Sequence, residues 1–362
     1  MRGSARVAEL DDLRGRIDAI DREMIRLLKE RASVAERIGE RKRGTGEQTL
    51  DPGRERDLFE RIAREDRGAF PLGALRTIFR EIVSASRALQ GDARVGYLGQ
   101  PGGFAHQAAV RHFGRSSAYE PLASPQHLLE RIESERLEFG VFALEGDPED
   151  PAFDALDLFL GAEPKIVAEF TDVTGYQAVG YAESPERIYA HPAALALCPR
   201  WRAALPAGVQ VEPVAGSQEA GKRAQEDRRS LALAPPLVAE TFALPVVDPS
   251  AEDAPRRTRR FLVLGPRESK PTGRDKTALL LSLENRPGRL LEVFQKLAAE
   301  RVNVAWIESR THRWRPGEHL FLLEVTGHRA DPPVAKALDA LGPVTLLARV
   351  LGSFPAAEAE EP

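Results

Sequence analysis

A long apolar stripe dominates the first ninety residues. With about 100° of rotation per residue and Arg31 set at zero, ten apolar side chains fall within about 60° of it: Leu10, Leu13, Ile17, Ile20, Met24, Leu27, Leu28, Val34, Ala35 and Ile38. The stripe predicts one helix of about 35 residues and also fits a heptad spacing. The short segments that follow cannot cover so long a stripe, so we expect a homodimer with interleaved helices.

Two shorter helices are expected next. Asp51 and Pro52 supply an N-cap and a first-turn proline for a second helix. A third helix is predicted from about Leu72 to Gln90, with apolar residues on its inner face: Leu75, Ile78, Phe79, Ile82 and Val83. The first 92 residues are therefore expected to form an all-α helical bundle.

The pattern changes after residue 92. From Ala93 to about Gly265, short apolar strands alternate with helices, which predicts an α/β domain with a mainly parallel sheet. A polar linker follows. Residues 276–355 then show the order strand, helix, strand, strand, helix, strand, typical of a ferredoxin-like βαββαβ unit. We therefore expect three domains, at 1–92, 93–265 and 276–355.

The composition and net charge of the chain argue against several classes of protein. A net charge of −4 over 362 residues predicts no attraction to nucleic acid or to a membrane surface. The single cysteine, Cys198, excludes an internal disulfide framework. We find no signal-like N-terminus, no membrane-spanning run and no metal-type Cys/His cluster. A cytoplasmic protein without a metal or another cofactor is expected.

Two cations lie on the apolar stripe. Arg31 is at its centre and Lys42 lies about 20° from it, and polar residues also continue the stripe of the third helix. An isolated case would be explained by cations that reach the edge of the stripe or pair with acids. Because the polar positions recur, we expect a pocket for an anion. Its candidate residues are Arg31, Lys42, Asp51, Arg54, Glu55, Ser86 and Gln90.

These segments resemble the all-helical chorismate mutase of the AroQ type. The resemblance covers "LRGRIDAIDREMIRLLKERASVAERIGERK", "DPGRER" and "SASRALQ". It implies that the seven residues named above line the active site and that Arg14 reaches in from the partner subunit. The implied reaction converts chorismate to prephenate by a unimolecular rearrangement, which needs no nucleophile, metal or proton transfer. Arginines would hold the carboxylates, and Lys42 and Gln90 would hydrogen-bond the ether oxygen.

The middle region resembles prephenate dehydratase, which implies a two-lobed fold like that of periplasmic binding proteins. The segments "RVGYLGQPGGFAHQAAVRHFG", "IYAHPAALALC" and "TRRFLVLG" carry the resemblance. Four positions depart from the family's pattern: Gly146 stands for an asparagine, Tyr176 for a histidine, Ala193 for a glutamine and Arg259 for a threonine. Thr258, one residue early on a strand, would face the opposite side. The remaining candidate residues are Glu145, His191, Ser217, Thr258 and Arg260.

The segment "LENRPGRLLEVFQKLAAERVNVAWIESRTHRW" resembles the ACT domain that senses phenylalanine in this family, with Arg289 at the position of the alanine in the family's Gly-Ala-Leu motif. The implied effector residues for L-phenylalanine are Gly288, Leu290, Asn303, Glu308, Ser309 and Arg310. An ACT fold that serves only for dimerisation is the alternative.

The order of the three regions resembles the bifunctional P-protein of phenylalanine biosynthesis. Because general acid help is typically worth about 10²–10⁴-fold, the four departures predict a working chorismate mutase joined to a degenerate dehydratase domain. The first alternative is the full bifunctional enzyme that makes phenylpyruvate. The second alternative is a non-catalytic, amino-acid-sensing partner of another shikimate-pathway enzyme.

Overall fold

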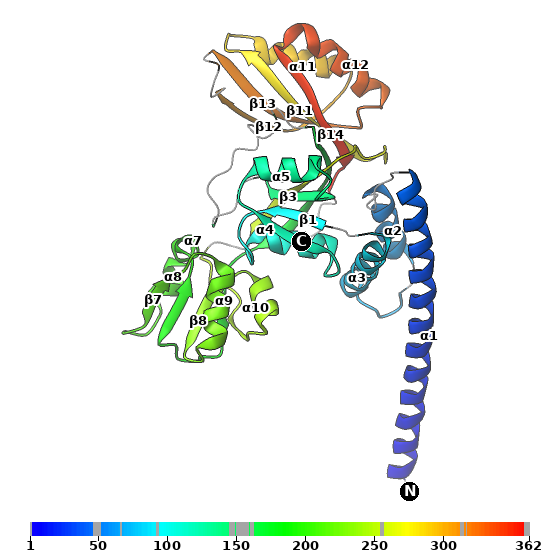
Figure 1. Ribbon diagram of the computed structural model, residues 1–362, viewed down its shortest axis with the longest axis vertical. Coiled ribbons are helices and arrows are strands. Elements are labelled where there is room, and N and C mark those ends of the chain that lie inside the picture. Colours follow the sequence, from blue (N-terminus) through cyan, green and yellow to red (C-terminus); the bar gives the residue numbers. More distant parts are fainter. Residues whose placement is uncertain are drawn as a thin grey trace. The chain divides into compact units, whose positions relative to one another are not determined.

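The computed structural model describes residues 2–45, 52–65, 67–91, 94–144, 149, 159, 163–253, 257–311, 315 and 317–357, of which 2–9, 43–45, 52, 257 and 310 only by their backbone. The chain forms two compact units. One contains residues 1–50, 62–93 and 113–117, and the other contains residues 51–61, 94–112 and 118–362. Figure 1 labels the elements along the chain.

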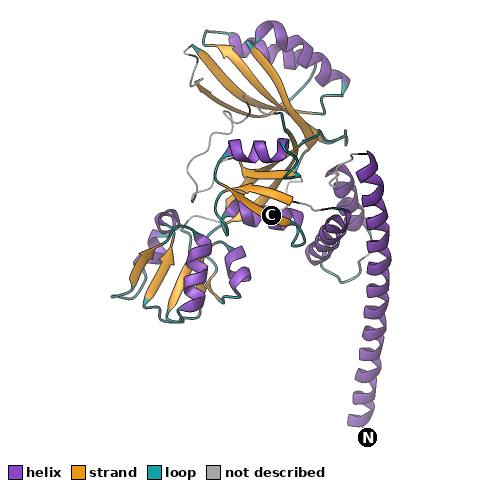
Figure 2. Ribbon diagram, in the orientation of Figure 1, coloured by secondary structure: helices purple, strands orange, loops and turns teal. Residues whose placement is uncertain are grey.

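The N-terminal region is helical, as predicted (Figures 1 and 2). Helix α1 spans Arg2–Thr45, α2 spans Pro52–Arg64 and α3 spans Leu72–Gln90. Helix α1 is longer than the expected 35 residues because the segment before Leu10 is also helical. Ile38 is half-buried, while nine of its large apolar side chains are each at least 41% exposed: Leu10, Leu13, Ile17, Ile20, Met24, Ile25, Leu27, Leu28 and Val34. The described part of a single chain therefore leaves most of the stripe uncovered.

The first lobe of the α/β region is built on a five-stranded sheet with the order β2-β1-β3-β10-β4. Its strands are β1 (Arg94–Leu98), β2 (Ala118–Leu122), β3 (Phe139–Ala143), β4 (Lys165–Thr174) and β10 (Arg257–Gly265). Helices α4 (Phe104–Phe113) and α5 (Pro125–Glu133) belong to this lobe.

The second lobe has its own five-stranded sheet with the order β7-β6-β8-β5-β9. Its strands are β5 (Gln177–Gly180), β6 (Arg187–Ala190), β7 (Gln210–Pro213), β8 (Ser230–Ala234) and β9 (Val246–Asp248). Its helices are α7 (Pro192–Leu197), α8 (Pro199–Ala203), α9 (Ser217–Glu226) and α10 (Pro236–Phe242).

Each sheet is mainly parallel, as predicted, but contains one strand that runs against the other four. Strand β10 runs antiparallel to both β3 and β4, and β5 runs antiparallel to both β8 and β9. The reason lies in the path of the chain, which leaves the first sheet through β4, builds the second lobe and returns through β10. A returning strand that pairs with the departing one must run against it.

The C-terminal region has the predicted ferredoxin-like order. It contains β11 (Asp275–Glu284), α11 (Arg289–Ala299), β12 (Val304–Thr311), β13 (Glu318–Thr326), α12 (Pro332–Leu341), a 3₁₀ turn at Gly342–Val344 and β14 (Leu347–Pro355). One face of this sheet shares an apolar core with the first lobe, in which Leu262 and Leu264 pack with Leu280, Leu322 and Phe354. Strand β10 therefore presents one face to the C-terminal sheet.

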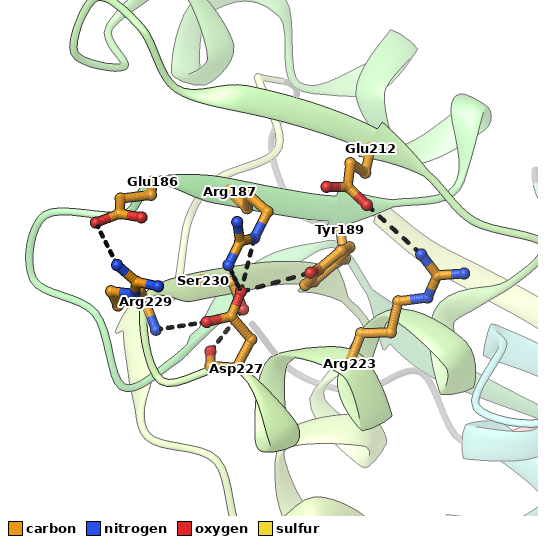
Figure 3. A network of polar contacts seen from close by, with 8 residues as sticks. All are labelled: Glu186, Arg187, Tyr189, Glu212, Arg223, Asp227, Arg229 and Ser230. Carbon is orange, nitrogen blue, oxygen red and sulfur yellow. Dashed lines mark hydrogen bonds and ion pairs between the residues drawn. The ribbon is translucent and has the colours of Figure 1, made fainter.

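A network of polar side chains joins elements within the second lobe (Figure 3). The guanidinium of Arg187 on β6 lies 2.6 Å from the carboxylate of Asp227, which also accepts the Arg229 backbone N–H at 3.1 Å. Burial raises the pKa of Asp227, but the hydrogen bonds from Arg187 and Arg229 outweigh it and hold the pKa below its usual value. These contacts join strand β6 to the end of α9, and we assign them a structural role.

Candidate active sites

Two of the predicted mutase residues meet between facing helices. The half-buried Arg31 of α1 donates one hydrogen bond to the Ile82 carbonyl at 3.3 Å and another to the Ser86 hydroxyl of α3. Ser86 is 8% exposed, and its hydroxyl donates to the Ile82 carbonyl at 2.7 Å. The cation at the centre of the apolar stripe is thus held by polar groups of α3 beneath it.

Gln90 lies where the same two helices are in close contact, and Lys42 lies three residues beyond the contacting residue of α1. Gly39 of α1 is buried, and a Cβ atom added to it would lie 2.6 Å from the Gln90 Cα and 2.8 Å from its carbonyl oxygen. Only glycine permits such an approach between two backbones. Lys42 and Gln90 are both half-buried. The glycine therefore fixes the separation of the helix segments that carry these two candidates.

Gly39→Ala is expected to lower both the stability and the mutase activity of the protein. The added methyl group meets backbone atoms of α3, and overpacking of this kind costs about 1–3 kcal/mol. Gly15 is the matched control, because it lies in the same helix with no atom within 4 Å of its added Cβ. Gly15→Ala should be neutral or slightly stabilising. Thermal midpoints and mutase rates of the two variants test this, and equal behaviour would contradict the packing account.

For the predicted mutase residues Arg14, Arg54 and Glu55, the structure gives the exposure of the side chain. Arg14 of α1 is 74% exposed in its side chain and pairs with Asp11 at 3.2 Å. On α2, Arg54 is exposed and Glu55 is half-buried. Asp51 lies outside the described residues. Arg14 thus points into solvent in the single chain, so its assignment across a subunit boundary stays a prediction.

Strand β10 separates the residues predicted for the dehydratase site onto two faces. Thr258, Arg259 and Arg260 pair in sequence with Val173, Asp172 and Thr171 of β4, and the pairing is regular until Val263. Successive side chains on a regular strand point to opposite faces. Thr258 therefore shares a face with Arg260, and no bulge turns it to the side of Arg259.

The Arg260 face is occupied by a buried charge cluster. The guanidinium of Arg260 lies 3.1 Å from the Glu169 carboxylate and donates to the carboxylate of Glu324. Lys276 completes the cluster, with its Nζ 2.7 Å from Glu169 and 3.5 Å from Glu324. Burial raises the pKa of Glu324, although the charge of Arg260 opposes that effect. Arg260 thus joins β10 to the C-terminal sheet.

The Arg259 face carries a different set of side chains. The Arg259 Nε donates to the Thr174 hydroxyl at 3.0 Å, and its guanidinium carbon lies 5.5 Å from the centroid of the Phe104 ring. Phe104 is the first residue of α4, and its ring packs edge-on against Tyr176 at 5.0 Å. Tyr176, predicted as a departure from the family's pattern, is 1% exposed and lies in this group. The contacts of Phe104 and Thr174 were not predicted, because neither residue has a charge or a motif of its own.

The two lobes are in contact at a glycine-rich turn and at a buried carboxylate beside this group. A Cβ atom added to Gly102, before α4, would lie 3.1 Å from the backbone nitrogen of Gln218 in α9. The buried Ser217 donates its hydroxyl to Glu149, whose carboxylate also accepts the Ser217 N–H at 3.1 Å. Glu149 follows β3 of the first lobe, so the carboxylate links the two lobes. Sequence reasoning identified Ser217 but missed Glu149, which stands in a run of acidic residues.

Of the remaining dehydratase candidates, the structure describes His191 but not Glu145. His191 is the N-cap of α7, where its Nδ1 accepts the Ala193 N–H at 3.2 Å. Ala193 therefore serves as a helix residue whose backbone, and not its side chain, makes the contact. Glu145 and Gly146 lie outside the described residues.

His106 supports the Gly102 turn. Its Nδ1 accepts the Gly102 N–H at 3.1 Å, and its ring stacks on Tyr97 at 4.5 Å. Tyr119 packs edge-on at 5.7 Å. Burial lowers the pKa of His106 to about 4, so the ring is neutral at pH 7 and able to accept this hydrogen bond.

Acidification should therefore weaken the fold through His106. The unfolded chain takes up a proton on this residue between its ordinary pKa of 6.5 and about 4, while the folded chain does not. The free energy of unfolding must fall as the pH drops through that window, with no contribution above it. His106→Phe keeps a stacking ring but removes the titration and should flatten this part of the profile. Denaturation midpoints across pH, with the exposed His127→Phe as control, test this. Equal slopes in wild type and His106→Phe would contradict it.

The effector candidates lie on two elements of the C-terminal domain. Gly288 is the N-cap of α11 with φ +88°, a left-handed conformation that favours glycine. Leu290 packs against the core beneath that helix. Asn303 is exposed, and its carbonyl accepts the Thr326 N–H at 2.9 Å. Glu308 and Ser309 are exposed on β12, and Arg310 is described there only by its backbone.

Neither a metal site nor a membrane span is found in the described part of the chain. Its His, Cys, Asp and Glu side chains form no group of three or more that is suited to hold a metal ion. None of its helices combines the length and the apolar character needed to cross a bilayer.

Comparisons with known proteins agree with this architecture. The chain matches the families chorismate mutase type II over residues 13–91, prephenate dehydratase over 95–269 and ACT domain over 277–343. It is 36% identical to a bifunctional chorismate mutase/prephenate dehydratase of Aquifex aeolicus, over 98% of this chain and 99% of that protein.

Two solved structures share the fold of the region after the helices. A prephenate dehydratase of Arthrobacter aurescens in complex with L-Phe has a TM-score of 0.63 and 26% identity, over 73% of this chain and 90% of that chain. A quorum quenching acylase has a TM-score of 0.62 and 26% identity, over 73% of this chain and 98% of that chain. One fold thus occurs in proteins named for different activities.

The full-length match favours the alternative of a complete bifunctional protein over the main prediction of a degenerate dehydratase domain. The likeness to the Aquifex protein covers 98% of the chain and therefore includes all three regions. The chain therefore belongs to the family of bifunctional chorismate mutase/prephenate dehydratases, with its mutase, dehydratase and ACT domains in that order.

Proposed function

We propose that the protein converts chorismate to prephenate and then prephenate to phenylpyruvate. The observation that carries this proposal is the likeness to the bifunctional relative over 98% of the chain. The contact between Arg31 and Ser86 supports the first activity, because it places a cation of α1 against a polar group of α3. A dianionic substrate would supply the negative charge that such a site needs.

The mutase step requires positioning and electrostatic stabilisation alone. The rearrangement breaks an ether C–O bond while a C–C bond forms, and negative charge develops on the ether oxygen. We assign Lys42 and Gln90 to that oxygen, and Arg31 to a substrate carboxylate. Glu55 and the region of Asp51 would hold the ring hydroxyl. No proton has to be transferred, so these residues act by binding a compact conformation of chorismate.

The dehydratase step requires a group at the leaving hydroxyl. Prephenate loses carbon dioxide and hydroxide together, and the electron pair of the broken C–C bond completes the aromatic ring. Arg259, Thr174 and Tyr176 gather beside the N-terminus of α4. The partial positive charge of that helix end favours an anionic substrate. This arrangement supports a binding site for prephenate in the first lobe.

A mutase with a non-catalytic dehydratase-like domain is the second candidate function. The specific observation in its favour is the position of Thr258, which shares a face with Arg260 and lies away from Arg259. Supplying prephenate directly to the full-length protein separates the two candidates. Saturable production of phenylpyruvate supports the bifunctional enzyme, and production at the rate of the enzyme-free background supports the second candidate.

A second copy of the chain is the proposed cover for the α1 stripe. Nine large apolar side chains of α1 are exposed in the single chain, and each gains about 1.5–3 kcal/mol on full burial. In a homodimer with interleaved helices, Arg14 would reach the active site of the partner. Cell fractionation would test the further proposal that this dimer is cytoplasmic.

L-Phenylalanine is the proposed effector of the ACT domain. The Arthrobacter structure is a complex with L-Phe, and Gly288 begins helix α11 here with backbone N–H groups able to receive a carboxylate. Arg289 pairs with Glu292 at 2.8 Å and with Glu284 at 3.4 Å. Arg289 replaces a smaller residue of the family's motif, and these two ion pairs hold its side chain against Glu284 and Glu292. Equilibrium dialysis with L-phenylalanine tests the proposal, and absence of binding would refute it.

A further inference from the structure

The polar linker between β10 and β11, residues 266–274, is fixed to both domains that it joins. The Ser269 hydroxyl donates a hydrogen bond to the Val167 carbonyl of β4 at 2.6 Å. The Ser269 carbonyl lies 3.1 Å from Nε2 of His328, a buried residue of the C-terminal domain. The linker therefore follows a defined path between the first lobe and the C-terminal sheet.

The linker ends in a turn that is held by a buried carboxylate. Asp275 accepts the Thr272 N–H at 2.7 Å, the Gly273 N–H at 3.0 Å and the Thr272 hydroxyl. Gly273 has φ +82°, a left-handed conformation that favours glycine. The Arg274 carbonyl accepts the Ala356 N–H at 2.9 Å, and its second lone pair can accept another donor. The carbonyl groups of this turn are thus held in fixed positions.

Arg56 of α2 binds this turn through both terminal nitrogens of its guanidinium. They donate to the Thr272 carbonyl at 2.9 Å and to the Arg274 carbonyl at 3.3 Å. The side chain is only 13% exposed, and its Nε lies 3.7 Å from the carboxylate of Glu60, one turn further along the helix. Because a guanidinium is a rigid planar fork, two such bonds fix its orientation as well as its distance.

The contact of Arg56 limits the rotation of α2 about its axis. Residues 51–61 belong to the same compact unit as the linker and the C-terminal domain, so the contact lies within one unit. Successive side chains of a helix are about 100° apart. A fixed direction for Arg56 therefore also fixes the directions in which the neighbouring Glu55 and Arg54 leave the helix.

We propose that Arg56 is a positioning residue for the mutase reaction, and that the turn at 272–275 is its support. Arg56 does not touch chorismate, but it holds α2 so that Glu55 meets the ring hydroxyl. This inference rests on the proposed mutase function and goes beyond it. It makes the mutase rate depend on a turn that lies 216 positions further along the chain, at the start of the C-terminal domain.

Arg56→Gln and Arg56→Lys in the full-length protein test this role. The glutamine variant should lower the mutase kcat/KM by about tenfold, because a misplaced binding group weakens the positioning of the substrate. Its KM for chorismate should rise, since Glu55 binds the ring hydroxyl before the reaction. The lysine variant keeps a charged donor without the planar fork, so its value should lie between glutamine and wild type. Arg61→Gln, at an exposed arginine of the same helix, is the matched control and should change nothing.

Asp275→Asn tests the other side of the contact. The amide replaces one acceptor oxygen by a donor, so the turn loosens and the mutase kcat/KM should fall. Because both residues act through one contact, the double variant Arg56→Gln/Asp275→Asn should be no slower than Arg56→Gln alone. The rate with prephenate supplied shows that each variant is folded. If Asp275→Asn fails to fold, Thr272→Val takes its place, since it removes only the hydroxyl contact with Asp275.

A mutase kcat/KM of Arg56→Gln equal to that of wild type would overturn the proposal. A lower kcat with unchanged KM would also overturn it, because that result indicates a smaller folded fraction and not a displaced Glu55. Additive losses in the double variant would show that Arg56 and the turn act separately. A wild-type protein without mutase activity would refute the proposed mutase function itself, and the positioning role of Arg56 with it.

Discussion

Replacing Lys42 with alanine should lower the turnover of chorismate by about 10²–10³-fold, the usual cost of losing one preorganised donor to developing negative charge. Lys42 lies three residues beyond Gly39, where α1 and α3 touch, and it is half-buried. Its ammonium group is the donor that we assign to the ether oxygen of the substrate. Because the charge on this oxygen grows only in the transition state, the loss should appear mainly in kcat.

Arg41→Ala provides the matched control for Lys42. Arg41 is the preceding residue on the same helix and is exposed. Its removal should leave the mutase rate near that of wild type. Circular dichroism of both variants checks that helix content is unchanged. A Lys42→Ala variant with near-normal turnover would show that the assignment to the ether oxygen is wrong.

Ile20→Asp should disrupt the dimer and abolish most of the mutase activity. Ile20 is 59% exposed in the single chain and lies about 20° from the centre of the stripe. In the proposed dimer this side chain is buried, where an unpaired carboxylate costs several kcal/mol. Loss of the dimer also removes Arg14 of the other subunit from the active site. Light scattering across a range of protein concentrations and the mutase rate measure the two effects.

Ser33→Asp introduces the same charge on the opposite side of α1. Ser33 is exposed and lies about 160° from the centre of the stripe, so assembly and activity should both persist in this variant. A wild-type protein that is monomeric and fully active would contradict the interleaved dimer. Unchanged assembly and rate in Ile20→Asp would contradict it equally.

Local pattern was sufficient to predict the helices and the C-terminal domain. The predicted third helix has the observed bounds, Leu72–Gln90, because its apolar spacing is strong and a proline precedes it. Arg31 and Ser86 were both predicted as polar positions on apolar stripes, and these residues, 55 positions apart in the chain, are in contact. Burial of a cation needs a partner, and that requirement can be recognised in a sequence before any contact is known.

Strand direction and lobe contacts could not be predicted in this way. Apolar periodicity shows that a strand exists but carries no information on the direction of its neighbours, so the antiparallel β10 was missed. The link between Glu149 and Ser217 joins residues from different lobes. Neither residue stands in a pattern that identifies the other. Gly102 is similar, because its close approach to Gln218 depends on where α9 lies.

The alternation of side chains on β10 was the informative part of the dehydratase prediction. It indicated that Thr258 and Arg259 would face opposite sides, and the regular pairing with β4 agrees with that expectation. The sequence could not show that Arg260 is held by Glu169 and Glu324, since these residues lie on two other strands. The contrast between the two arginines became clear only from those contacts.

The central claim is that one chain carries out both reactions, and its most direct test supplies chorismate to the full-length protein. Chorismate, prephenate and phenylpyruvate are followed separately at neutral pH, with an enzyme-free sample of prephenate to measure its spontaneous decay. The account predicts that prephenate rises and then falls, while phenylpyruvate forms at a saturable rate proportional to the enzyme concentration. Accumulation of prephenate, with phenylpyruvate appearing only at the enzyme-free rate, would contradict it.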